Sequence, residues 1–112
     1  MNTALNYRRQ APARKGISTY QQNQILNLSP TELILKIYDL IIISIKKEDI
    51  SKANSGFTEL IASLNFDQKE IAMGLFRLYR YCQECLRKNQ YKQALQVVED
   101  LRESWAKAFN LN

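Results

Sequence analysis

A capped helix start that leads into an unusually apolar helix is the feature of this chain that most constrains its fold. The segment SPTELILKIYD, residues 29–39, supplies Ser29 as a cap, Pro30 at the first helical position and Glu32 to bond back to the Ser29 amide. At 100° per residue, the apolar side chains from 33 to 45 cover an arc of about 220°, whereas about 100° suffices for an ordinary amphipathic helix. We therefore predict a helix over residues 30–47 with more apolar surface than a small domain needs.

The rest of the chain also favours helices. Three glycines and two prolines leave long stretches uninterrupted, and apolar residues at helical spacing predict further helices over residues 50–65, 68–88 and 91–109. Helices of similar length joined by short connections predict an all-α, antiparallel up-down-up-down four-helix bundle. Residues 20–28 are expected to add a short N-terminal helical segment.

The helix predicted over residues 68–88 has two further expected features. Asp67 offers an acidic cap at its start. Its buried stripe is expected to include Ile71, Leu75, Leu78, Tyr79, Cys82, Cys85 and Leu86. Met73 and Phe76 lie on the opposite, charged face and form a second candidate for contact with a partner.

The net charge of +5 is unevenly distributed along the chain. Four basic residues and no acidic residue lie in residues 1–19, whereas residues 20–112 carry 12 basic and 11 acidic residues. We therefore expect a mobile basic tail over residues 1–19 and a single helical domain over residues 20–112. Because the domain is nearly neutral, the sequence argues against nucleic acid as a partner, although a basic-tailed nucleic-acid-binding protein stays an alternative.

The sequence offers little for catalysis. It contains no histidine, which removes the commonest general base and the commonest transition-metal ligand. Cys82 and Cys85 form a lone C-x-x-C pair on the apolar side of a helix, which favours small core residues over a zinc or redox site. We expect no enzyme activity, no cofactor and no metal. No run is long and apolar enough for a membrane span, and a cytoplasmic protein without a membrane partner is expected.

The excess apolar surface of the first helix has three explanations that its pattern leaves equally open. It can accept an amphipathic peptide from another protein, it can form a homodimer, or the helix can be the central one of the bundle. A monomer or weak homodimer is compatible with the sequence, and a self-associating bundle is an alternative function.

Several stretches, in this order, resemble the family of the flagellar secretion chaperone FliS. They are YQQN at 20–23, SPTELILKIYD at 29–39, KEDISKAN at 47–54, SLNFD at 63–67, EIAMGLFRLYRY at 70–81 and LRESW at 101–105. The chain departs from the family in having Leu40 where relatives carry glycine. It is also about two helical turns shorter on each side of the first hairpin, at residues 39–47 and 50–66.

The resemblance implies a cytoplasmic export chaperone that binds the C-terminal segment of flagellin, prevents premature polymerisation and keeps the subunit competent for type III export. The flagellar export gate is a further candidate partner. Candidate binding residues on the first helix are Leu33, Ile34, Ile37, Tyr38 and Ile41. The resemblance also implies that Tyr20, with Ile25 and Leu26, forms a displaceable lid over that surface.

Overall fold

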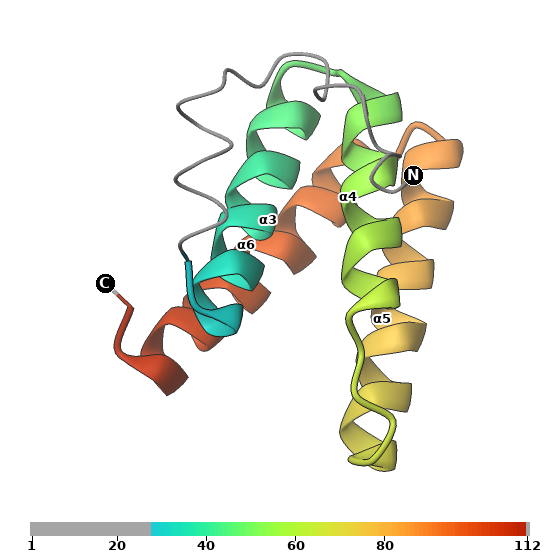
Figure 1. The fold of residues 1–112 in the computed structure, drawn as a ribbon. Coiled ribbons are helices and arrows are strands. Elements are labelled where there is room, and N and C mark those ends of the chain that lie inside the picture. The colour runs from blue at the N-terminus through green and yellow to red at the C-terminus, as the bar shows by residue number, and fades with distance from the viewer. Residues whose placement is uncertain (1–27, 112) are drawn as a thin grey trace, which may run out of the picture. The chain divides into compact units, whose positions relative to one another are not determined.

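The computed structural model describes residues 28–111, which form four α-helices and no strand. The helices are α3 (Pro30–Lys46), α4 (Ile50–Ala62), α5 (Lys69–Arg87) and α6 (Tyr91–Phe109). The chain divides into two units, Met1–Pro30 and Thr31–Asn112. Among these helices, α4 runs antiparallel to α3, and α5 runs antiparallel to α4, while α6 crosses obliquely behind α3 and α4 (Figure 1). The all-α four-helix bundle is therefore confirmed, whereas the predicted N-terminal helical segment lies outside the described residues.

Three of the four helices end in the same way. After α3, α5 and α6, one residue adopts a left-handed backbone conformation, at Glu48, Asn89 and Asn110 with φ of 57°, 61° and 54°. The next amide then donates to a carbonyl five residues earlier, from Asp49 to Ser44, from Gln90 to Cys85 and from Leu111 to Ala106, at 2.8, 2.8 and 2.9 Å. This Schellman arrangement satisfies carbonyls that a helix end leaves without partners. It stops α3 and α5 sharply, so each of the connections that follow needs only three residues.

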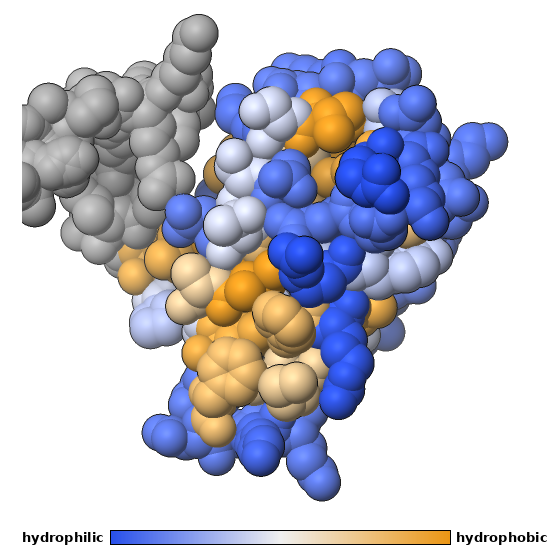
Figure 2. Space-filling model, turned by 90° about the vertical axis from the view of Figure 1, so that its right-hand side faces the viewer, coloured by the Kyte–Doolittle hydropathy of each residue, from blue (hydrophilic) through white to orange (hydrophobic). Residues whose placement is uncertain are grey.

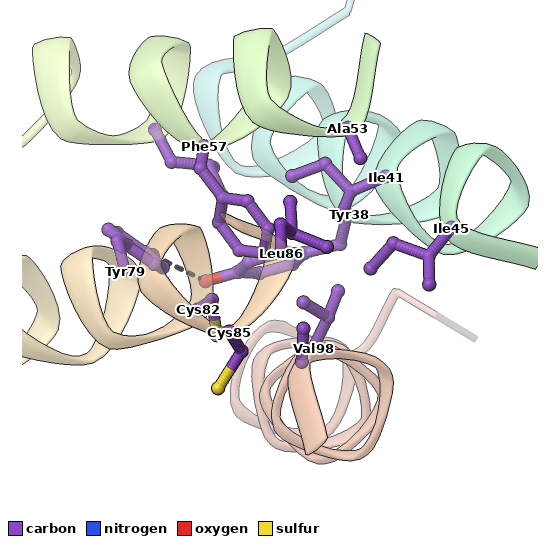
Figure 3. Packing of buried hydrophobic residues seen from close by; sticks show 12 residues of the cluster. Tyr38, Ile41, Ile45, Ala53, Phe57, Tyr79, Cys82, Cys85, Leu86 and Val98 are labelled. Atoms are coloured by element: carbon purple, nitrogen blue, oxygen red, sulfur yellow. Dashed lines mark hydrogen bonds between the residues drawn. The ribbon is translucent and has the colours of Figure 1, made fainter. Parts of the chain in front are cut away.

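Twelve buried side chains from all four helices form one core (Figure 3). The largest of those that are almost fully buried are Tyr38 and Ile41 of α3, Phe57 and Leu60 of α4, and Val98 of α6. Cys82 and Cys85 of α5 are also in this core, with 0% and 1% of their surface exposed, and they form no disulfide. The expectation that the two cysteines are small core residues is therefore confirmed.

Three polar contacts join α3 to α6. The Lys46 ammonium lies 3.8 Å from the Glu99 carboxylate, Arg102 Nε donates to Asp39 Oδ1 at 2.5 Å, and Trp105 Nε1 donates to the Thr31 carbonyl at 2.9 Å. The partners on α3 span about 22 Å of helix, whereas those on α6 span about 9 Å, at 1.5 Å per residue. The two helices therefore cross at a steep angle instead of lying side by side.

The backbones of α4 and α5 pack closely, as do those of α5 and α6. Between α4 and α5, Gln83 Nε2 donates to the Asn54 carbonyl at 3.3 Å and to Thr58 Oγ1 at 3.1 Å. Gln83 Oε1 in turn accepts from Arg80 Nη1 at 3.3 Å. This network fixes the register of the two helices on their solvent-facing side.

Two predictions about the start of α5 are wrong. Gln68, and not Asp67, is the N-cap residue, because the Asp67 amide donates to Asn65 Oδ1 in a preceding turn and the helix begins only at Lys69. Ile71, expected to be buried, is 64% exposed, while its neighbour Ala72 is buried. Ala72, Tyr79, Cys82 and Leu86 form the buried series of α5, so Ile71 points away from the core in the first turn.

Alkaline pH is expected to destabilise the fold. Burial raises the pKa of the Tyr38 and Tyr79 hydroxyls above their usual 10.0, and it raises the pKa of the Cys82 thiol from 9.0 to about 12. All three groups are neutral when protonated, so the folded state holds their protons more tightly than the unfolded state does. Their contribution to stability is complete below about pH 9 and is lost as the pH rises through the folded pKa values.

Urea unfolding at a series of pH values measures this loss. The free energy of unfolding is expected to fall steadily between about pH 9 and about pH 12. Cys82→Ala should weaken the pH dependence in the part of this range where the thiol titrates. A free energy of unfolding that stays constant to about pH 11 would contradict the prediction.

Candidate partner-binding surface

The N-terminal half of α3 keeps part of its apolar surface in contact with solvent. Leu33, Ile34 and Ile37 are half-buried, and Lys36 between them is exposed. Ile34 and Ile37 pack against the buried core, whereas Leu33 is not among the described residues that do so. These three candidate residues therefore lie at the edge of the core and are partly exposed.

Tyr38 and Ile41, the other two candidates on α3, lie inside the core, each with 1% of its surface exposed. The Tyr38 hydroxyl is 2.7 Å from the Tyr79 hydroxyl, as Figure 3 shows, and the ring meets Trp105 edge-on at 6.2 Å between centroids. Both side chains hold α3 against the other helices because they occupy the stripe of α3 that faces them. In this structure they do not form part of the accessible surface of α3.

The predicted lid residues Tyr20, Ile25 and Leu26 lie outside the described residues. Ser29 and Glu32 are described, but the capping arrangement proposed for them stays a prediction.

An aromatic pair at the end of α6 extends the apolar surface next to α3. Trp105 is half-buried and bonds to the carbonyl of Thr31 in the first turn of α3, and Phe109 is 46% exposed. The two rings are 4.9 Å apart between centroids. The apolar spacing over residues 91–109 predicts the helix but does not show that these two side chains stay partly exposed. Their four-residue spacing in the last turns of a helix is the signal that points to a shared outer surface.

A second apolar surface lies at the connection between α4 and α5. Phe66 is 50% exposed, and Met73 and Phe76 are half-buried. Figure 2 looks at the side of the molecule on which α5 lies, and shows apolar side chains gathered there below a more polar area. Met73 and Phe76, expected on a charged face, are thus more buried than predicted, but they still contribute to the surface.

The comparison with known families decides what kind of protein carries these surfaces. A family model described as "Flagellar protein FliS" matches residues 43–112, more than half of the chain. The chain belongs to the FliS family. The matched range covers α4, α5 and α6 and the end of α3, and it begins after the SPTELILKIYD and YQQN segments. A search of curated proteins and a search of solved structures each found no significant match.

FliS is a family of chaperones for flagellar assembly and export, and not a family of enzymes. The described part of the chain agrees with this in being a helical bundle. None of its described helices combines the length and the hydropathy that crossing a membrane requires.

Proposed function

We propose that this protein is a cytoplasmic export chaperone that binds the C-terminal segment of flagellin. The half-buried apolar residues Leu33, Ile34 and Ile37 of α3 form the central part of the binding surface, and Trp105 and Phe109 of α6 extend it. By covering the flagellin segment, the chaperone prevents premature polymerisation and keeps the subunit competent for type III export. Membership of the FliS family is the single observation that carries this proposal.

The arrangement of the surface supports a helical or extended peptide as the ligand. Leu33, Ile34 and Ile37 have the spacing of a ridge along a helix, against which a second amphipathic helix can pack. Trp105 offers a large ring whose polar nitrogen is already bonded within the protein, so binding an apolar residue there leaves no indole N–H without a partner. A flexible segment that becomes ordered on binding loses conformational entropy, and an extended apolar surface is needed to offset that cost.

The earlier expectations for the N-terminal region form part of the same proposal. Tyr20, Ile25 and Leu26 act as a lid that competes with flagellin for the surface on α3. Residues 1–19 form a basic tail, and residues 20–112 form the binding domain. The export gate is a second partner to which the loaded chaperone delivers its client.

Calorimetry with a peptide of about 40 residues from the C-terminus of flagellin tests the proposal. We expect a dissociation constant in the micromolar range or below, which corresponds to at least about 8 kcal/mol of binding free energy. Leu33→Asp is expected to weaken binding at least about tenfold, because a carboxylate would have to be desolvated against the apolar segment. The helical circular dichroism should be unchanged, since Leu33 is outside the buried core.

Ile43→Asp is the matched control for this experiment. Ile43 lies on the same helix and is 49% exposed, but it points to a different side of α3 from Leu33. Binding by this variant should equal that of the unchanged protein. Failure of the unchanged protein to bind the peptide would overturn the proposed function, and equal weakening by both variants would overturn the assignment of the surface.

A further inference from the structure

An open depression between α4 and α5 lies apart from the α3 surface. It has a volume of about 500 Å³, and its floor and walls include the apolar residues Ile50 and Leu86. The polar and charged lining residues on α5 are Arg80, Gln83, Glu84 and Arg87. The volume is within the range of about 300–1,000 Å³ that is usual for small-molecule pockets. The proposed chaperone function makes no use of this depression.

The depression continues into the second apolar surface along a single face of α5. Met73, Phe76, Arg80, Gln83 and Arg87 follow one another at intervals of three or four residues, so they lie in one row on the helix. The row is apolar at its N-terminal end and basic at its C-terminal end. Figure 2 shows the apolar area next to strongly hydrophilic side chains on this side of the molecule. A ligand that follows the row would therefore need both apolar and acidic groups.

The arginines in this row are held in place differently. Arg80 Nη1 donates to Gln83 Oε1, and Gln83 is itself bonded to α4, so the guanidinium is oriented without being neutralised. Within residues 28–111, Arg80 and Arg77 form no salt bridge. Arg87 is paired with Glu84, whose carboxylate also lies 3.5 Å from Lys88. The Arg80 guanidinium is thus positioned to donate hydrogen bonds to a carboxylate of another molecule.

Charge is concentrated at this part of the protein. Residues 77–92 contain five basic residues and one acidic residue, although residues 20–112 as a whole are nearly neutral. The resulting positive potential attracts negatively charged partners. We propose that the row on α5, together with the α4 wall of the depression, is a docking surface for an acidic amphipathic segment of another protein. Its apolar residues contact Met73 and Phe76, and its carboxylates pair with Arg80 and, beyond it, with Arg87.

The composition of the surface favours a peptide over a nucleic acid. A phosphate backbone is best bound by a continuous row of cations, whereas here Glu84 stands between Arg80 and Arg87 and the row begins with two apolar residues. The hydroxyl and amide groups of Ser51, Asn54 and Thr58 on the α4 wall suit the polar groups of a peptide.

A pair of synthetic fluorescein-labelled peptides tests the proposal. The first is an amphipathic peptide of about 14 residues with leucine at positions i, i+3, i+4 and i+7 and glutamate elsewhere, and the second carries glutamine in place of every glutamate. Fluorescence anisotropy should show binding of the glutamate peptide to the full chain in the range of about 10–100 μM. The glutamine peptide should bind at least about tenfold more weakly, and binding of the glutamate peptide should fall as salt is raised.

Three variants locate the contact. Arg80→Gln and Phe76→Ser are each expected to weaken binding of the glutamate peptide about fivefold or more, from loss of the carboxylate partner and of the apolar contact. Lys36→Gln, which removes one positive charge from an exposed position on α3, should leave the affinity unchanged. Absence of binding, equal weakening by Arg80→Gln and Lys36→Gln, or tighter binding of a single-stranded DNA oligomer than of the glutamate peptide would overturn the proposal. None of these results depends on flagellin binding at α3.

Discussion

Replacing Gly56 by alanine is expected to lower the free energy of unfolding by about 1–2 kcal/mol, although alanine is the better helix former. A β-carbon at position 56 would lie 2.9 Å from Ile41 Cδ1 and closer still to Cγ1. Ile41 has 1% of its surface exposed and is surrounded by core side chains, so it cannot move aside without displacing them. The close approach of α4 to α3 therefore depends on the missing side chain at this position.

Gly74→Ala is the matched control for Gly56→Ala. Gly74 is also inside a helix, but a β-carbon there would have no atom within 4 Å beyond its own helix backbone and its chain neighbours. The substitution should raise the free energy of unfolding by about 0.5–1 kcal/mol, from the lower conformational entropy of the unfolded chain and the better helix propensity. Urea unfolding of both variants should place them on opposite sides of the unchanged protein. If both variants are stabilised, the close contact between Gly56 and Ile41 does not constrain the fold.

Tyr38→Phe is expected to lower the free energy of unfolding by about 1–3 kcal/mol. The two hydroxyls of Tyr38 and Tyr79 are 2.7 Å apart in the core, and removing one leaves the other buried without this partner. The rings would stay in place, since the phenyl ring fills nearly the same volume. The expected loss therefore reflects the desolvated hydroxyl and not a cavity.

A double-mutant cycle separates the hydrogen bond from the packing. Tyr79→Phe should cost about as much as Tyr38→Phe, whereas the variant with both changes should be close to the unchanged protein, because no buried hydroxyl of the pair then lacks its partner. The cycle is measured by urea unfolding at neutral pH. Simple addition of the two single losses would show that the hydroxyls do not interact.

Much of the fold could be predicted from the sequence. Apolar spacing placed α3 and α6 to within one residue of their observed ends, because short connections and strong periodicity leave little freedom there. The end of α4 and the cap residue of α5 were less well predicted. Asn65 forms a local turn in that connection, and such side-chain bonds compete with a helix cap without changing the apolar pattern.

The candidate site could be predicted only in part. Periodicity shows which side of α3 is apolar, but it does not show which residues of that side the other helices cover. The steep crossing of α3 and α6 buries Tyr38 and leaves Leu33, four residues from the start of SPTELILKIYD, half-buried at the edge. Similarly, nothing in the local sequence of Gly56 indicates that Ile41 lies against it. These properties depend on how the helices are placed relative to one another, which a single sequence does not specify.

The sharply ended helices have a consequence for how the chain reaches its folded state. A connection of only three residues joins α3 to α4, and another joins α5 to α6. Residues that meet within each of these helix pairs are therefore close together in the sequence. Closing such short loops loses little chain entropy, and folds dominated by local contacts assemble in microseconds to milliseconds. A bundle built in this way can complete its core soon after its last helix is synthesised, with little time spent exposing apolar surface to neighbouring chains.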